Sequence, residues 1–313
     1  MKIEFDLSGT HRLLIHVGYH KTATTWMQQQ LFVPEHGYAQ IARHEVVFEK
    51  IIRPHGLRFD PEVMQQHVAE SLVKLAENDV PVISSELLVG NQFFGGRESD
   101  IYAQRLQSIF GEVRIMISIR AQMKILPSVY MQYLSRGGTL PPEQFFSGKT
   151  DLGYFAFDLG HFEYDRLLRH YQSLFGGENV LVVTQEALQA DMDGVAQRIA
   201  NFSGNTQFNG LSAAARQVQS ASYPEYAAPI LRRINRIQRS VLNPSPVVSV
   251  GQTPQGLYRS VGYLSRRNPF ARILKTWAPV SNFVRSEFLD YYTASNGRLR
   301  EYVSEAIDLS GYD

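Results

Sequence analysis

In the first two thirds of the chain, short apolar runs alternate with longer segments in which apolar residues recur at helical spacing. The apolar runs predict buried strands at Arg12–Val17, Val80–Ser84, Val113–Ile119 and Val180–Val183. The segments between and after them predict helices over Thr24–Phe32, Pro61–Glu77, Ser99–Phe110, Met123–Leu134, Tyr164–Leu174 and Asp191–Phe202. Strands separated by helices favour an α/β fold, in which helices flank a central, mostly parallel sheet.

After about Leu211 the strand signals fade. Helical segments there bracket a stretch rich in Pro, Gly and Ser, Ser240–Gly256. We therefore expect an α/β core over residues 1–210 and a helical C-terminal region over residues 211–313. The second is expected to pack on the first, so that the whole forms one domain.

The composition excludes several kinds of chemistry. Of 313 residues, 44% are hydrophobic, 19% are charged and none is cysteine. The lack of cysteine rules out disulfides, thiolate zinc sites, iron–sulfur clusters and a cysteine nucleophile. No apolar run approaches the roughly 18 residues of a membrane span. Charged residues interrupt Met1–Ser8, which argues against a secretory signal, so the expected location is cytoplasmic.

The net charge of +1 argues against a dedicated nucleic-acid-binding domain, but it hides an asymmetry. Residues 211–313 hold 13 basic and 7 acidic side chains (+6), which leaves 18 basic and 23 acidic (−5) for residues 1–210. The stretch Leu231–Lys275 holds nine Arg or Lys and no Asp or Glu. Such a stretch suggests an anionic partner, including a membrane surface, unless these residues pair with acids elsewhere in the chain.

A candidate anion site follows the first predicted strand directly. The segment Gly18-Tyr19-His20-Lys21-Thr22-Ala23-Thr24-Thr25-Trp26 joins a strand to a helix through a turn that carries Gly, Lys and hydroxyls. Backbone N–H groups at the start of a helix favour an anion, and Lys21, Thr24 and Thr25 add donors. The nucleotide-triphosphatase pattern is not met, since Lys21 precedes the hydroxyls and no second Gly stands before it. A capped helix beside a surface Lys is the alternative.

A second candidate anion site follows the strand Val113–Ile119. Arg120 comes directly after this strand, and Ser128 follows eight residues later, about two helical turns along. Open α/β sheets bind ligands at the carboxyl ends of their strands, so Arg120 and Ser128 are placed to bind one phosphate group between them. A purely structural Arg is the alternative.

Together the two motifs resemble those of sulfotransferases that use 3′-phosphoadenosine 5′-phosphosulfate (PAPS). That family has a loop of the type Tyr-Pro-Lys-Ser-Gly-Thr-Thr-Trp after its first strand, and an Arg with a Ser eight residues later after a further strand. The run Val180–Glu186 is similar to another family strand. The likeness spans roughly Arg12 to Gly204 and is greater to bacterial and carbohydrate-directed members. It implies a P-loop-like nucleotide-binding core.

The resemblance also implies roles for residues. Lys21, Thr22, Ala23, Thr24 and Thr25 would hold the 5′-phosphosulfate, with Lys21 on the departing bridging oxygen. Arg120 and Ser128 would bind the 3′-phosphate. Trp26 would stack on the adenine, unless it is a core tryptophan. The donor would be PAPS and the product 3′,5′-ADP (PAP), and the transfer requires no metal.

Two loop residues depart from the family pattern: His20 replaces the usual Pro, and Ala23 replaces the usual Gly. The C-terminal sequence signatures of the animal cytosolic enzymes are absent, and Arg136-Gly137-Gly138 is only weakly similar to one of them. One or more of Arg259, Arg266 and Arg267 are candidates for the missing cofactor contact, with no basis for a choice.

A base is expected, because the acceptor loses its proton as it attacks. Glu86 ends the segment Val82–Glu86 at the same sheet edge as the loop, and it resembles the catalytic Glu of glycan-modifying relatives. His20 is the second candidate, and His16 reads as a core histidine. Alternatively, Glu86 is a helix cap or an ion-pair partner for a residue such as Arg97.

The predicted function is sulfuryl transfer from PAPS to a hydroxyl or amine. A P-loop small-molecule kinase and a non-catalytic nucleotide-binding or membrane-surface protein are the alternatives. A glycan, a glycolipid and a bacterial natural product are all compatible acceptors. The helical C-terminal region, with its basic stretch and its tyrosines, is expected to shape the acceptor site. The oligomeric state stays open.

Overall fold

The structure is a computed structural model that describes residues 13–217, 223–246, 248–267, 274, 276–303 and 307–312. The segment Met1–Ser8 and Arg12, the first residue of the first predicted strand, lie outside these ranges. In the part of the chain that is described, no helix is long and apolar enough to cross a membrane.

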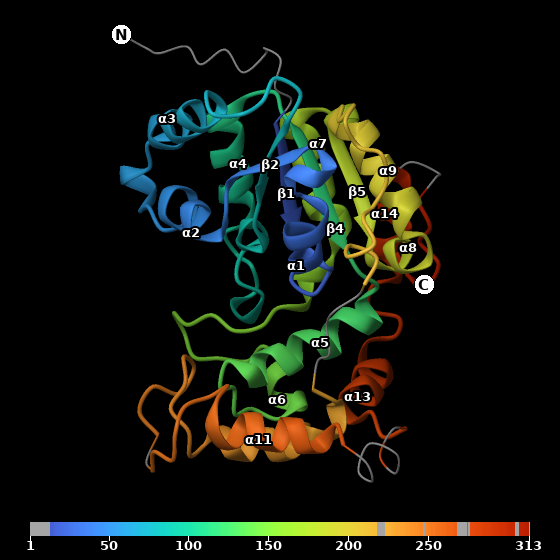
Figure 1. Cartoon of the computed structure of the whole chain (residues 1–313). Coiled ribbons are helices and arrows are strands. Elements are labelled where there is room, and N and C mark those ends of the chain that lie inside the picture. The colour runs from blue at the N-terminus through green and yellow to red at the C-terminus, as the bar shows by residue number, and fades with distance from the viewer. Residues whose placement is uncertain are drawn as a thin grey trace.

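Five parallel strands form one sheet in the order β2-β3-β1-β4-β5 (Figure 1). They are β1 (Leu14–Gly18), β2 (Tyr38–Ala42), β3 (Val80–Ser84), β4 (Arg114–Ile119) and β5 (Val180–Thr184). The predicted α/β class with a mostly parallel central sheet is confirmed. β1 and β3 are buried along their whole length, as near-continuous apolar runs in parallel sheets usually are.

The edge strand β2 was not predicted, because its sequence Tyr-Ala-Gln-Ile-Ala is short, is interrupted by Gln and holds two alanines, which have low strand propensity. The polar Gln40 in its middle is accommodated by the neighbouring helix. Its side-chain amide donates hydrogen bonds to the carbonyls of Gln28 (2.6 Å) and Phe32 (2.9 Å). A side chain that looks unfavourable for a strand thus ties β2 to the segment that follows β1.

The six predicted helices of the core are found to within a few residues, except that the helix from Pro61 ends at Leu72 rather than Glu77; the short helices His44–Val47, Pro142–Phe146 and Gln185–Ala190 were not predicted. Asp191 caps the last of the predicted helices by accepting a hydrogen bond from the N–H of Gly194 at 2.9 Å. The helices are α1 (Thr24–Trp26), continued by a π-helical turn (Met27–Leu31), α2 (His44–Val47), α3 (Pro61–Leu72), α4 (Ser99–Phe110), α5 (Gln122–Ser135), α6 (Pro142–Phe146), α7 (Tyr164–Phe175), α8 (Gln185–Ala190) and α9 (Met192–Ser203).

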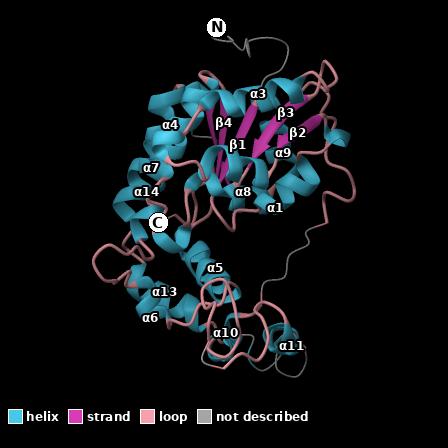
Figure 2. Ribbon diagram, turned by 90° about the vertical axis from the view of Figure 1, so that its left-hand side faces the viewer, coloured by secondary structure: helices cyan, strands magenta, loops and turns pink. Residues whose placement is uncertain are grey.

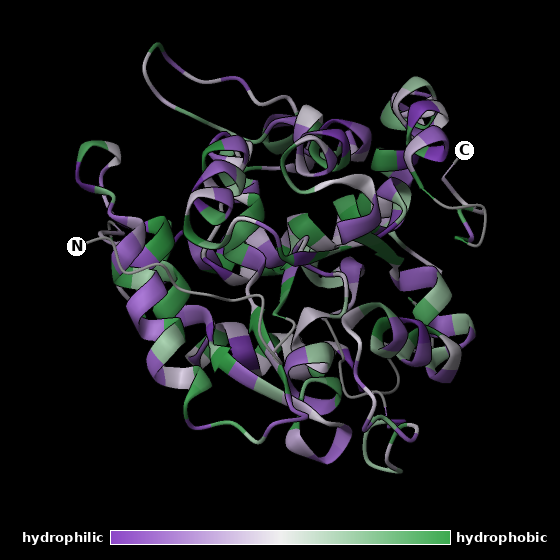
Figure 3. Ribbon diagram, turned by 90° about the horizontal axis from the view of Figure 1, so that it is seen from above, coloured by the Kyte–Doolittle hydropathy of each residue, from purple (hydrophilic) through white to green (hydrophobic). Residues whose placement is uncertain are grey.

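Alternate residues of the central strands pack into two separate apolar clusters, one on each face of the sheet. Ile15 and Val17 pack on the side of α4 and α7, whereas Leu14 and Met116 pack on the side of α1 and α9. Figure 2 shows these helices on the two faces of the sheet. In Figure 3 the strands at the centre are mostly hydrophobic, and the surrounding helices alternate in hydropathy. His16 points to the same face as Leu14.

The named elements of the described chain after Leu211 are helical, as predicted. The α-helices among them are α10 (Ala228–Asn235), α11 (Gly256–Ser265), α13 (Pro279–Phe288) and α14 (Thr293–Tyr302). The last of these returns to the core, where Ser295 and Arg298 bind the carboxylate of Asp165 on α7. The other three lie with α5 and α6 beyond the carboxyl ends of the strands (Figures 1 and 2).

Candidate anion-binding site at the carboxyl edge of the sheet

The two sequence motifs meet at the centre of the sheet. β1 and β4 are neighbours, and the chain leaves β1 toward β2 on one side and β4 toward β5 on the other. Such a point of reversal in an open parallel sheet opens a crevice in which ligands bind. Gly18 ends β1 and Arg120 follows β4, so both candidate anion sites lie at this crevice.

The backbone of the loop after β1 is shaped for an anion. Lys21 (φ 70°) and Ala23 (φ 65°) adopt the left-handed conformation, and Thr22 between them does not. Alternation of this kind turns successive N–H groups toward one concavity, which favours an anion. Ala23, where the sulfotransferase family has Gly, thus takes a glycine-like conformation, at a cost of about 1 kcal/mol. Gly18 cannot be replaced by a larger residue without a clash, because a Cβ there would lie 2.5 Å from Thr24 Cγ2.

A chain of buried polar side chains supports this loop from below. The Nδ1 of His16 lies 2.8 Å from Ser84 Oγ on β3, and its Nε2 lies 3.0 Å from Ser118 Oγ on β4. Ser118 Oγ lies 2.7 Å from Thr22 Oγ1, which donates to the carbonyl of Tyr19 at 2.6 Å. None of these four side chains is more than 1% exposed. Three strands and the loop are therefore joined through side chains that have no contact with water.

The direction of each hydrogen bond in this chain can be assigned. Thr22 uses its proton on the carbonyl of Tyr19, so Ser118 donates to Thr22 and accepts from His16 Nε2–H. At the other end, the Nδ1 of the neutral ring accepts from Ser84 Oγ, which itself accepts from the amide of Gln28 (3.2 Å). The network thus fixes His16 as the neutral Nε2–H tautomer. The expectation that His16 is a satisfied core histidine agrees with this geometry.

We expect stability to fall in acid partly because of His16. Burial lowers the pKa of His16 from 6.5 to about 4, so as the pH falls the unfolded chain binds a proton before the folded chain does. Its contribution is therefore complete above pH 6.5 and is lost toward pH 4, at about 1.4 kcal/mol per pH unit. Urea unfolding between pH 7 and pH 5 measures this slope. His16→Asn should flatten it and the exposed His55→Gln should not; equal slopes in all three proteins would contradict the assignment.

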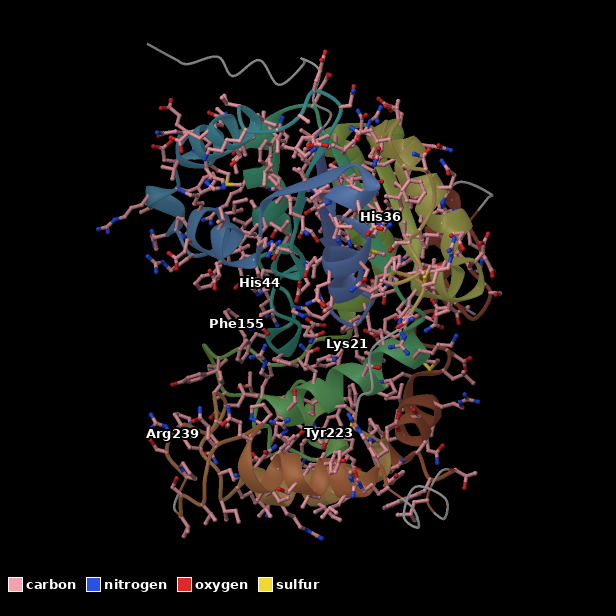
Figure 4. The ribbon with its side chains drawn as sticks, viewed as in Figure 1. Lys21, His36, His44, Phe155, Tyr223 and Arg239 are labelled. Atoms are coloured by element: carbon pink, nitrogen blue, oxygen red, sulfur yellow. The ribbon has the colours of Figure 1, made fainter. Side chains whose placement is uncertain are left out.

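Positive charge converges on the loop. Lys21 is half-buried, and its pKa is lowered first by burial and then by Arg120 and Arg136, while Glu86 acts in the opposite direction. A cavity of about 230 Å³ is lined by Lys21, by Arg136 and Ser135 at the end of α5, and by Thr253 and Pro254. A bound anion would relieve this repulsion, which is the electrostatic mark of an anion site. Figure 4 places Lys21 between the sheet and α5.

The structure brings Arg120 and Ser128 together as the spacing predicts. Arg120 Nη1, just before α5, donates to Ser128 Oγ on that helix at 3.0 Å. Tyr164 holds the strand end by donating to the carbonyl of Arg120 at 2.6 Å. Glu186, after β5, lies 3.5 Å from Lys124 and raises the pKa of Arg120 against the lowering effect of burial. The guanidinium and the hydroxyl are therefore held side by side before any ligand arrives.

Glu86 lies at the end of β3, close to His44 of α2. Its Oε2 is 3.7 Å from His44 Nδ1, is buried, and makes no hydrogen bond within the described residues. A buried carboxylate oxygen without a donor is costly unless a ligand supplies one. Arg97, the alternative partner for Glu86, instead lies 3.7 Å from Asp158.

His20 lies within the electrostatic reach of Glu86, and burial lowers its pKa to about 4 despite the opposing effect of that carboxylate. The ring is thus neutral at pH 7 and only weakly basic.

The remaining loop residues take different positions. Thr24 is 6% exposed and Thr25 is exposed. The indole N–H of Trp26 donates to the carbonyl of Ala215 at 2.7 Å, and its ring is packed partly against the apolar cluster on that side of the sheet. One edge of Trp26 is therefore held by the segment after α9.

Two residues of the site were not identified from the sequence as site residues. His44 follows β2, so its position at the same sheet edge could be inferred only once that strand was known. Arg136 was noted only for its weak similarity to a family signature, and the structure shows that it lines the cavity beside Lys21. Arg259, Arg266 and Arg267, the candidates for a further cofactor contact, belong to α11 or follow it and do not line this cavity.

Comparison with known proteins gave matches among solved structures only. No family model matches the chain, and no curated protein matches it in sequence. A sulfotransferase from Alicyclobacillus acidocaldarius is similar with TM-score 0.46 and 15% identity, over 71% of this chain and 89% of that one. The mouse sulfotransferase SULT7A1 complexed with PAP is similar with TM-score 0.38 and 12% identity, over 92% of this chain and 88% of that one. Both of these proteins are named as sulfotransferases.

Proposed function

We propose that the protein transfers a sulfuryl group from PAPS to a hydroxyl or amine of an acceptor. The observation that carries this proposal is the pairing of two anion sites at one crevice. The Lys21 loop follows β1, and the hydrogen-bonded pair Arg120–Ser128 follows the adjacent β4. PAPS carries anionic groups at both its 5′ and 3′ positions, whereas ADP lacks the 3′-phosphate.

The residues present suit this donor. The concave backbone at Lys21 and Ala23, with the hydroxyls of Thr24 and Thr25, would hold the 5′-phosphosulfate. Arg120 and Ser128 would hold the 3′-phosphate through charge-assisted hydrogen bonds. Trp26 stays a candidate for contact with the adenine. Bound PAPS supplies the sulfuryl group and a leaving phosphate oxygen.

The chain's own residues would perform the remaining steps. Glu86 Oε2 accepts the proton of the acceptor hydroxyl as that oxygen forms its bond to sulfur. The bond between sulfur and the bridging oxygen breaks, and Lys21 stabilises the negative charge that develops on that oxygen. The products are the sulfated acceptor, PAP and a protonated Glu86, which returns its proton to solvent. Neutral His20, beside both groups, is the second candidate for the base.

One approach for the acceptor lies on the side of His44. A cavity of about 600 Å³ lies there, lined by Gln28, Phe32, Gln40, Arg43 and His44, among others. His44 both lines this cavity and lies 3.7 Å from Glu86, which connects the cavity to the proposed base. A glycan, a glycolipid and a natural product all carry hydroxyls that suit this position. We further propose that the reaction takes place in the cytoplasm.

Nucleotide preference tests the donor. In a thermal-shift titration, PAP should raise the melting temperature more than ADP at equal concentration, because Arg120 and Ser128 contact only the 3′-phosphate. Arg120→Ala should weaken PAP by about 30-fold, the value of a hydrogen bond to a charged group, and leave ADP nearly unchanged. Arg169→Ala, an exposed arginine on α7, is the matched control. Equal stabilisation by ADP and PAP would contradict the proposal.

A further inference from the structure

Exposed apolar side chains are concentrated in one part of the molecule. Among the described residues, 21 large hydrophobic side chains are exposed, and nine of them lie between Ile230 and Trp277. Several belong to the loop between α10 and α11, where Val241 is 76% exposed and Val250 is 52% exposed. A soluble surface normally scatters such residues singly, so this concentration marks an interaction surface.

The same part of the molecule is strongly positive. No Asp or Glu occurs between Leu231 and Lys275. Six arginines there are exposed in the described chain: Arg233, Arg236, Arg239, Arg259, Arg266 and Arg267. Two of them stack on aromatic rings, Arg266 on Tyr223 and Arg267 on Tyr263. This stacking does not neutralise their positive charge. A partner for this surface must therefore be anionic.

The helix α11 combines both properties on its outer half. Leu257 and Leu264, seven residues apart, lie on one stripe of that half; Arg259 and Tyr263 are exposed on the same half, and Arg267 is exposed just after the helix ends. The inner half, with Tyr258 and Gly262, packs inward; a Cβ at Gly262 would lie 2.4 Å from the ring of Tyr223. Figure 1 shows α11 in the layer farthest from the sheet.

We propose that this surface, formed by α10, α11 and the loop between them, docks on a membrane that contains anionic lipids. Arginines on one surface with exposed Leu, Val and Tyr fit the interfacial zone, where lipid phosphates meet acyl chains. A soluble polyanion would satisfy the arginines but not the aliphatic side chains. A neutral membrane would satisfy the aliphatic side chains but not the arginines.

The docking surface adjoins the candidate active site. Val241, Thr253 and Pro254, all from the loop between α10 and α11, line the cavity that contains Lys21 and Arg136. A membrane under this loop would bring lipid headgroups to the mouth of that cavity. If the proposed function holds, the favoured acceptor is therefore a hydroxyl of a glycolipid or a lipid-linked sugar. Membrane docking itself does not depend on sulfuryl transfer.

Vesicle sedimentation of the full chain tests the docking. We expect binding to vesicles of phosphatidylcholine mixed with phosphatidylglycerol, little binding to phosphatidylcholine alone, and release near 1 M salt, where the Debye length is about 3 Å. Arg236→Gln with Arg259→Gln should weaken binding about 30-fold, since each arginine contributes about 1 kcal/mol near an anionic leaflet. Leu257→Ser with Leu264→Ser should weaken it at least about tenfold.

Lys74→Gln with Arg169→Gln removes two exposed charges from the core and is the matched control, expected to bind like the parent. Unchanged thermal melting of each variant shows that it is folded. Absence of binding to the anionic vesicles would overturn the proposal. Full binding by the Leu257/Leu264 variant would also overturn it, because the contact would then be that of any polyanion. Since PAP binding is measured without vesicles, either proposal can fail without the other.

Discussion

Lys21→Ala is expected to lower kcat by about 10³-fold and to weaken PAP binding by less than about tenfold. The difference arises because the Lys21 ammonium would meet a full negative charge on the bridging oxygen only as the bond to sulfur breaks. In the ground state it shares the 5′ group with backbone N–H donors. Alanine keeps the Cβ, so the left-handed backbone at this position (φ 70°) carries the same strain in both proteins. Labelled-sulfate transfer and PAP titration measure the two quantities.

The exposed Lys74→Ala is the matched control and should leave both quantities unchanged. An equal loss of kcat and PAP affinity in Lys21→Ala would show that Lys21 binds the donor without stabilising the transition state. Full activity in Lys21→Ala would remove it from the site.

The central part of the site was predictable because its signals are local. A buried apolar run followed at once by Gly, Lys and hydroxyls fixes where the first strand ends and what lies there. The eight-residue interval between Arg120 and Ser128 is close to two helical turns, and although α5 begins only at Gln122, the two side chains meet in a hydrogen bond at 3.0 Å. Glu86 was placed by the same rule, at the end of a strand that the sequence defines to the residue.

The rest depends on contacts between segments far apart in the sequence. The strand β2 could not be predicted because Gln40, in its middle, finds hydrogen-bond acceptors only in the carbonyls of Gln28 and Phe32, which lie outside the strand. Without that strand, His44 could not be assigned to the sheet edge. The orientation of His16 depends on Ser84 and Ser118, 68 and 102 residues away. The place of Arg136 depends on how α5 crosses the edge of the sheet, which no local pattern encodes.

Glu86→Gln is expected to lower kcat by about 10²- to 10⁴-fold while PAP binding stays within about twofold. The amide keeps the shape of the side chain and removes its capacity to accept a proton. The orphaned Oε2, buried 3.7 Å from His44, is the atom that this change alters. His20→Asn should cost less than about tenfold, because an imidazole whose pKa burial lowers to about 4 is a weak base at pH 7.

These two variants decide between the candidate bases, since His20 precedes Lys21 in the chain and Glu86 acts electrostatically on both residues. Transfer of labelled sulfate to one acceptor at saturating PAPS gives kcat for each variant, and PAP titration verifies that the donor site is intact. A large loss in His20→Asn with near-normal turnover in Glu86→Gln would assign the proton to His20. In that case the orphaned carboxylate of Glu86 would serve to raise the basicity of the ring, as its opposing effect on the pKa of His20 already indicates.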